Sequence, residues 1–196
     1  HRTLRVGSGM KIAVFVPNWV GDAVMATPAL AAIRRRWSDG EVVAVLRPYV
    51  ADVLEGTGLV DRVIKWDPRD RTRGVSGWRL ARRLRRERFD TAVLFPNSLR
   101  TGWMAWLSGA TRRIGFARDG RRWLLTDPVR VTSGGTPHPV LDDYLSLVSH
   151  LDCRSTDHRM HLATSARDEA CWREIRARRG DVLRSRPYVR IGVVAS

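Results

Sequence analysis

Short runs of apolar residues recur along the first half of the chain, and segments with helical periodicity separate them. The apolar runs cover residues 11–17, 41–47, 62–66 and 91–96, and the helical patterns cover residues 23–37, 48–55, 76–88 and 98–108. Strands that are apolar throughout are typical of a parallel sheet buried on both faces. Helical crossovers between such strands are almost always right-handed. The pattern therefore predicts an α/β fold with a Rossmann-like, doubly wound, mostly parallel sheet.

The pattern becomes less regular after residue 109. We expect short strands at 112–116 and 123–127 around a basic turn at 117–122, a loop at 132–139, helices at 138–151 and 166–179, and a strand at 188–195. No helical pattern follows the last strand, so it either joins the same sheet or is the first strand of a second domain. Residues 1–9 are polar and basic, and we expect them to be an upstream extension or a cloning scar before a natural start at Met10.

Composition narrows the classes of protein that this chain can belong to. The net charge is +15, and all but two of the 35 basic residues are arginine, which indicates a coding bias as much as selection for a basic surface. The charge still favours anionic partners such as phosphorylated sugars, nucleic acid or an acidic membrane face. No apolar run approaches the ~20 residues needed to span a bilayer, and the N-terminus has no apolar signal segment.

The two cysteines and the histidines near them predict no metal site. Cys153 and Cys171 lie outside any C-x-x-C pattern, and we expect them to be reduced thiols. His158 and His161 lie between them, but this spacing fits no common zinc site. The Gly-rich phosphate-binding fingerprints and the nucleic-acid-binding motifs are also absent from the sequence. We expect no metal and no cofactor.

The segment from Val16 to Leu30 is the most informative candidate site. An apolar strand leads into a turn that contains Gly21 and Asp22, and a helix follows. We expect Gly21 to let the backbone bend where a Cβ would clash. Asp22 has two possible roles: it caps the helix, or it accepts a proton from a substrate at the carboxyl end of the sheet. Thr27-Pro28 is a rival start for the helix, so Asp22 is less needed as a cap.

Polar residues follow the fourth strand in a similar arrangement. Asn97 and Ser98 come directly after the strand, with Arg100 in the first turn of the next helix. Each of the first two could be an ordinary helix cap, a contact to a polyol, or both. In the turn at 117–122, Arg118 and Arg121 could clamp carboxylates or phosphates.

Two further patterns concern surfaces. Six arginines crowd the helix predicted at 76–88, whose other face carries apolar residues including Trp78. This is typical of a solvated face, and an anionic membrane surface is the functional alternative. Trp103 and Trp106 lie three residues apart on one predicted helix, a spacing that indicates core packing more than base stacking.

Three segments resemble one known family, the ADP-heptose:lipopolysaccharide heptosyltransferases of glycosyltransferase family 9, and most closely the heptosyltransferase II type. Residues 17–25 (PNWVGDAVM) resemble its opening motif, and residues 94–100 (LFPNSLR) resemble its second. Residues 113–116 (RIGF), followed by Arg118, Gly120 and the run 124–127 (LLTD), are similar to its third. The motifs come in the family's order across residues 11–151.

The resemblance implies an inverting, two-domain enzyme of the GT-B fold at the cytoplasmic face of the inner membrane, with peripheral membrane association. Its N-terminal domain binds the acceptor, a heptosyl-Kdo-lipid A inner core, and its C-terminal domain binds ADP-L-glycero-D-manno-heptose. The position of the catalytic base corresponds to Asp22. The acceptor-binding candidates are Asn18, Trp19, Gly21, Asn97, Ser98, Arg100, Arg118 and Arg121. No nucleic acid partner is expected.

The family pattern also predicts domain boundaries. It implies an acceptor-binding domain at 10–165, an interdomain helix and linker at 166–187, and the first strand of a donor-binding domain at 188–196. The Asn-Pro-Gly-type loop that follows such a strand in the family is absent here, so we expect a truncated chain with little or no transferase activity alone. Two alternatives stay open: a transferase for another nucleotide sugar, and a non-catalytic Rossmann-like module that binds anionic glycolipid or nucleic acid.

Overall fold

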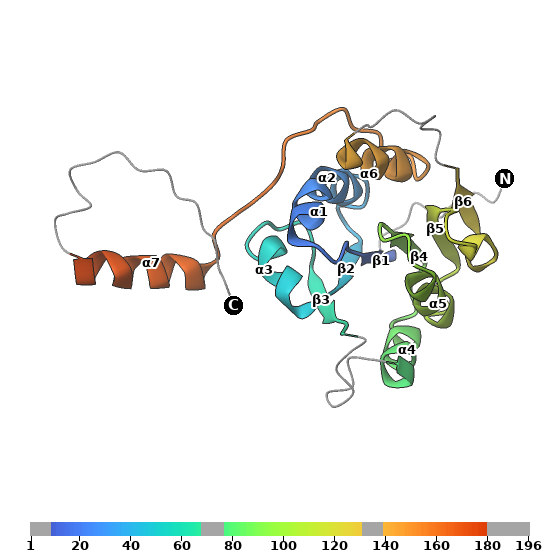
Figure 1. Ribbon diagram of the computed structural model, residues 1–196, viewed down its shortest axis with the longest axis horizontal. Coiled ribbons are helices and arrows are strands. Elements are labelled where there is room, and N and C mark those ends of the chain that lie inside the picture. The colour runs from blue at the N-terminus through green and yellow to red at the C-terminus, as the bar shows by residue number, and fades with distance from the viewer. Residues whose placement is uncertain (1–8, 68–76, 131–138, 180–196) are drawn as a thin grey trace.

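A computed structural model of the chain describes residues 9–67, 77–130 and 139–179. Six parallel strands form one sheet in the order β3-β2-β1-β4-β5-β6 (Figure 1). The strands are β1 (Lys11–Phe15), β2 (Glu41–Leu46), β3 (Arg62–Lys65), β4 (Thr91–Leu94), β5 (Arg112–Phe116) and β6 (Asp127–Val129). The helices are α1 (Val20–Met25), α2 (Thr27–Arg36), α3 (Ala51–Leu54), α4 (Gly77–Glu87), α5 (Leu99–Leu107), α6 (Val140–Ser149) and α7 (Ala166–Arg179), with 3-10 turns η1 (Pro48–Val50) and η2 (Arg121–Leu124). This strand order is that of a doubly wound Rossmann-like sheet, so the predicted fold is confirmed.

The central strands are apolar throughout because both faces of the sheet are covered. Successive β1 side chains point to opposite faces: Ile12 and Val14 pack with α1, α2 and α6, whereas Ala13 and Phe15 pack with α4 and α5. Figure 1 shows these helices as two layers around the sheet. The four β1 side chains are completely buried, which explains why the strand has no polar alternation.

The single helix expected over 23–37 is wrong, because the chain forms two helices there. Pro28 has no N–H to donate to the carbonyl of Val24, four residues earlier, so the helical ladder is interrupted at this point. The Thr27 hydroxyl donates to that carbonyl instead, over 2.7 Å, and accepts from the backbone N–H of His161 over 2.9 Å. α1 begins at Val20, so Asp22 lies inside its first turn.

The strand expected at 123–127 is also wrong. The chain forms η2 over this stretch and enters β6 only at Asp127. Leu124 and Leu125 are buried, and an apolar pair of this kind has no periodicity that separates a strand from a tight turn. Two other predicted features, most of the loop at 132–139 and the strand at 188–195, lie outside the described residues, as does nearly all of the predicted extension at 1–9.

Several tryptophans are exposed where the sequence pattern predicted packing. Trp103 and Trp106 are 39% and 46% exposed, and Trp78 on α4 is 69% exposed. The core-packing prediction for the first two is therefore wrong. α5 buries the opposite side of the helix, which carries Thr101 and Met104 among others, because that side faces the sheet.

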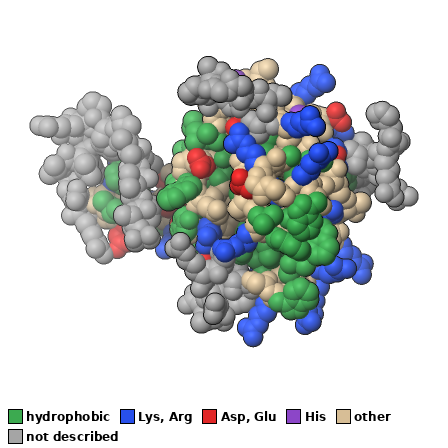
Figure 2. All heavy atoms as spheres, turned by 45° about the vertical axis from the view of Figure 1, so that its right-hand side comes forward, with side chains coloured by type: hydrophobic (Ala, Val, Ile, Leu, Met, Phe, Trp, Pro, Cys, Tyr) green, Lys and Arg blue, Asp and Glu red, His purple; other side chains and the backbone are tan. Residues whose placement is uncertain are grey.

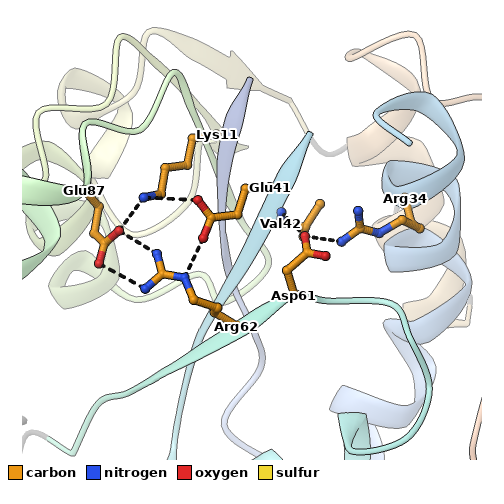
Figure 3. Close-up of polar contacts among 7 residues, drawn as sticks. All are labelled: Lys11, Arg34, Glu41, Val42, Asp61, Arg62 and Glu87. Carbon is orange, nitrogen blue, oxygen red and sulfur yellow. Dashed lines mark hydrogen bonds and ion pairs between the residues drawn. The ribbon is translucent and has the colours of Figure 1, made fainter. Parts of the chain in front are cut away.

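An ion network joins strands to α4 at the amino ends of the strands (Figure 3). Glu87 on α4 accepts from Lys11 over 2.5 Å and from Arg62 over 2.6 Å, and Arg62 also bonds Glu41 over 2.5 Å. The hydrogen bond from Arg62 is the main cause that lowers the pKa of Glu87, and the bond from Lys11 acts in the same direction. The network joins β1, β2, β3 and α4 at the edge of the sheet opposite the loops described below.

α7 extends away from the sheet (Figure 1). Ser165 and Asp168 cap its first turn reciprocally: the backbone N–H of Ser165 donates to the Asp168 carboxylate over 2.8 Å, and the Asp168 N–H donates to the Ser165 hydroxyl over 3.2 Å. Its described side chains are largely exposed. Across the described ranges, no helix combines the length and the apolar character needed to cross a membrane.

Candidate functional site

The loops after β1 and β4 meet at the carboxyl edge of the sheet, where the order of the strands reverses direction. A hollow of about 290 Å³ opens there, lined by Asn18, Arg47, Trp66, Ser98, Arg100 and Thr101. Ligands of open α/β sheets bind at this kind of topological switch point. The structure therefore brings together residues from the first two sequence motifs, which are about 80 positions apart.

Asp22 lies beside this edge in the first turn of α1. The N-cap of α1 is Trp19, and no side chain caps the helix. In the described part of the chain, no hydrogen bond or ion pair engages the Asp22 carboxylate, which is half-buried. Burial, and then the nearby Asp22 carboxylate, raise the pKa of Tyr144 on α6, so Asp22 lies near Tyr144. No described hydrogen bond therefore supports a helix-cap role for Asp22, although the carboxylate still lies favourably at the positive end of the helix dipole.

The other candidates of the first motif lie around the same turn. The backbone carbonyl of Asn18 accepts from the Tyr49 hydroxyl over 2.8 Å, and its side-chain oxygen lies 3.4 Å from Nε of Arg47. Trp19 is 75% exposed. Gly21 was expected to avoid a Cβ clash, but this is wrong: no atom lies within 4 Å of a Cβ built there. The space beside Gly21 is open instead.

The second motif provides one cap and one free cation. Ser98 is the N-cap of α5 and accepts from the backbone N–H of Thr101 over 3.3 Å. Asn97 accepts through its side-chain oxygen from Arg121 over 3.3 Å. Arg100 is exposed at the hollow, and its side chain makes no hydrogen bond or ion pair within the described ranges.

Arg121 is buried, and this placement corrects its assignment as a direct acceptor contact. Its side chain is completely inaccessible to solvent and donates to the backbone carbonyls of Phe116 over 2.9 Å, Ser98 over 3.4 Å, and Pro96. Burial lowers the pKa of Arg121 to about 10, which still leaves it charged at neutral pH. It therefore holds the loop after β4 in place rather than facing a ligand.

Gly115 leaves the room that this guanidinium needs. A Cβ at position 115 would lie 3.2 Å from Nη2 of Arg121 and 3.2 Å from the Cβ of Leu94. Arg118, by contrast, is exposed on the turn after β5, and within the described chain its side chain has no hydrogen-bond or ion-pair partner. Of the two arginines assigned to this turn, only Arg118 is exposed.

The sequence reasoning missed several residues around the hollow. Arg47 lines it and pairs with Asp67 over 2.6 Å, and Trp66 and Thr101 lie on its wall. The sequence contains a signal for two of these residues, since Arg47 and Trp66 are the last residues of predicted strands. Side chains that end neighbouring parallel strands meet at one edge of a sheet. As for metals, the described residues contain no group of three or more His, Cys, Asp or Glu that could hold an ion.

Comparison with known proteins finds heptosyltransferases both by family model and by sequence similarity. The family model described as Glycosyltransferase family 9 (heptosyltransferase) matches residues 77–196. Lipopolysaccharide heptosyltransferase 2 of Escherichia coli is 26% identical over 139 residues, which cover 70% of this chain and 40% of that protein. Lipooligosaccharide heptosyltransferase 2 of Haemophilus ducreyi is 24% identical over 123 residues, covering 60% of this chain and 34% of its own length.

Solved structures share the fold at lower identity. The E. coli ADP-heptose heptosyltransferase II superposes with a TM-score of 0.65 at 22% identity, over 83% of this chain and 49% of that one. A family 9 glycosyltransferase from Veillonella parvula gives a TM-score of 0.71 at 21% identity, over 87% and 49%. The chain thus spans about half the length of these structures and less than half of the curated relatives.

Proposed function

Because the chain belongs to glycosyltransferase family 9, the heptosyltransferase family, we propose that it is the acceptor-binding portion of an inverting glycosyltransferase. The enzyme moves heptose from ADP-L-glycero-D-manno-heptose to the inner core of lipopolysaccharide, and Asp22 is its general base. Relatives named as heptosyltransferases support the sugar and the acceptor. One structural neighbour is named as an ADP-heptose heptosyltransferase, which supports the donor.

The observation that carries this proposal is the free carboxylate of Asp22. It is half-buried in the first turn after the central strand, and none of the described hydrogen bonds or ion pairs engages it. A carboxylate that neither caps a helix nor pairs with a cation is available to accept a proton. Its place at the carboxyl edge of the sheet supports a catalytic use.

The chemical step follows from that position. Asp22 accepts the proton of the acceptor hydroxyl as its oxygen attacks the anomeric carbon of the heptose. The new glycosidic C–O bond forms on one face while the bond to the ADP oxygen breaks on the other, so the configuration inverts and ADP leaves with the bonding electrons. General-base assistance of this kind contributes about 10²–10⁴-fold to rate.

Recognition of the acceptor rests on the exposed cations. Arg100 at the hollow and Arg118 on the turn after β5 have no described partner, so they are available for carboxylate or phosphate groups of the inner core. Arg47 is positioned by Asp67, whose carboxylate balances its charge, and it presents its remaining N–H donors at the wall. Asn18, Trp19, Asn97 and Ser98 complete the proposed acceptor site.

The domain boundaries and location are part of the same proposal. Residues 10–165 bind the acceptor, residues 166–187 link the domains, and residues 188–196 begin the donor-binding domain. The acceptor is lipid-linked, so the enzyme works peripherally at the cytoplasmic face of the inner membrane. The chain spans 40% of its E. coli relative, so heptose transfer is proposed for the complete two-domain enzyme.

Calorimetric titration of the 196-residue chain with a heptosylated inner-core oligosaccharide tests the acceptor site. We expect saturable binding that Asp22→Asn retains within about twofold, since a general base is not needed for binding. The double variant Arg100→Ala/Arg118→Ala loses at least about tenfold, because each charge-assisted hydrogen bond contributes ~1.5–3 kcal/mol. In the complete two-domain enzyme, Asp22→Asn lowers kcat by about 10²–10⁴-fold.

A matched control separates a site from diffuse charge. Arg173→Ala/Arg176→Ala on the exposed α7 removes the same two charges far from the hollow, and it keeps wild-type affinity. Equal losses in both double variants, or equal affinity for unrelated polyanions with a steep salt dependence, would contradict an acceptor site.

A further inference from the structure

Four apolar side chains gather on the outer side of α5 and η2. Leu99, Trp103 and Trp106 project from α5 and Trp123 projects from η2, with exposures of 41%, 39%, 46% and 61%. The Trp103 ring contacts those of Trp106 and Trp123 edge to face, at centroid distances of 5.5 and 5.0 Å. Figure 2 shows a continuous apolar area over this part of the molecule. We call these four residues the tryptophan patch.

The tertiary structure brings the two elements of the patch together. A Cβ at Gly102 would lie 2.9 Å from Cδ1 of Leu124, so the glycine lets α5 and η2 approach closely. This contact sets the Trp123 indole against the Trp103 indole. Large apolar groups that cluster at the surface, rather than being scattered singly, mark sites of interaction.

The surroundings of the patch are cationic. Across the full described spans of α4, α5 and η2, Glu87 is the only acidic residue, and it is held by Lys11 and Arg62. The same spans hold exposed arginines at positions 79, 82, 83, 85, 86, 100 and 122. The Cγ atom of Arg85 lies 3.9 Å from a Cβ built at Gly109, so the arginines of α4 run beside the end of α5. Figure 2 shows Lys and Arg side chains around the apolar area.

This combination matches the chemistry of an anionic bilayer surface. Indole rings prefer the boundary between headgroups and acyl chains, where an apolar ring and a polar N–H are both accommodated. Arginines around such rings meet lipid phosphates, and the attraction falls with salt. These three described elements carry no unpaired acidic side chain. They therefore lack the negative charges by which a surface of mixed charge would repel an anionic bilayer.

The patch also adjoins the hollow. Leu99 lies between Ser98 and Arg100, both of which line the hollow. A lipid surface in contact with the patch would therefore bring headgroups and attached sugars beside the loop after β4.

We propose that the tryptophan patch and the arginines of α4 dock this chain on an anionic lipid bilayer. The inference rests on the proposed function in one respect: the lipid-linked acceptor is the reason that such docking would be useful. The docking itself depends on the exposed indoles and on the charge around them.

Sedimentation with vesicles tests this proposal directly. The 196-residue chain is mixed with vesicles of phosphatidylglycerol and phosphatidylethanolamine that contain no lipopolysaccharide, and with phosphatidylcholine vesicles. We expect binding to the anionic vesicles that weakens with salt, and quenching of tryptophan emission by brominated lipids. Trp103→Ser/Trp106→Ser/Trp123→Ser lowers the partition coefficient at least about tenfold and reduces the quenching, of which Trp78 on α4 keeps a part.

The control variant is Met160→Ser/Leu162→Ser, which removes two exposed apolar side chains outside the patch and keeps wild-type binding. If the triple variant does not fold by circular dichroism, Trp123→Ser alone and Arg82→Glu/Arg86→Glu replace it, because these side chains are exposed. Each replacement variant weakens binding, the charge reversal by at least about tenfold.

Several results would overturn the proposal. These are failure of the wild type to bind anionic vesicles, equal binding by the patch variants, or quenching that is undiminished without the three indoles. Self-association of the wild type that the triple variant loses, without vesicle binding, would assign the patch to contact between protein copies. Asp22→Asn should bind vesicles as the wild type does, because Asp22 is not part of the patch. If the wild type fails to bind vesicles, the oligosaccharide titration still tests the acceptor site independently.

Discussion

Replacing Arg121 with methionine should destabilise the protein by about 3 kcal/mol. Methionine keeps a similar length but leaves the carbonyl of Pro96 without its donor, and it removes the charge-assisted bond to the carbonyl of Phe116, which keeps only the backbone N–H of Arg118. The unsatisfied Pro96 carbonyl costs ~1–3 kcal/mol and the lost bond from a charged donor to Phe116 costs ~1.5–3 kcal/mol, which gives ~2.5–6 kcal/mol together. Part of this loss is recovered, because a guanidinium no longer has to be held out of water. For a chain of this length, about 3 kcal/mol lowers Tm by about 6–12 °C.

Urea and thermal unfolding followed by circular dichroism measure this effect. The matched control is Arg122→Met, the exposed neighbour on the same 3-10 turn, which should change stability by no more than about 0.5 kcal/mol. Arg121→Lys should fall between the two, because one ammonium group cannot reach carbonyls at the ends of both β4 and β5. A wild-type urea midpoint for Arg121→Met, or an equal loss in Arg122→Met, would refute the structural role.

Two further predictions concern the ion network and the glycines. The hydrogen bond from Arg62 lowers the pKa of Glu87 below 4.5 in the folded state, so its stabilisation is complete above that pH and is lost as pH falls through the lowered value. Glu87→Gln should therefore lower stability by ~1–2 kcal/mol at pH 7 and flatten the acid limb of stability against pH; an unchanged acid limb would contradict this. Gly115→Ala should cost ~1–3 kcal/mol by crowding Arg121, whereas Gly21→Ala has open space and should stay within about 0.5 kcal/mol in urea titrations; similar losses in both variants would contradict the packing argument.

The sheet could be predicted from sequence because its signal is local. Strands such as β1 and β2 are apolar at nearly every position, since both faces are covered, and helical periodicity between them marks the crossovers. The position of Asp22 after β1 was predictable for the same reason. The break between α1 and α2 was also visible in principle, because Pro28 cannot donate to the carbonyl four residues before it.

The features that the sequence pattern missed depend on contacts between distant segments. Arg121 and Arg118 are equivalent as sequence, three residues apart on one basic turn. Only the approach of the loop after β4, with the space left by Gly115, makes one a buried clamp and leaves the other exposed. Trp103 has core-like helical spacing, yet its exposure depends on which side of α5 meets the sheet.

The sequence by itself determined the fold class, the motif positions and the residue types at the carboxyl edge, because periodicity and turn chemistry act over a few residues. The tertiary structure decided which charges are free. It buried Arg121 in a ring of carbonyls, left the carboxylate of Asp22 without a described partner, and joined the indoles of α5 and η2 into one surface. The accessibility and partners of a charged side chain depend on segments far along the chain, and no local pattern encodes them.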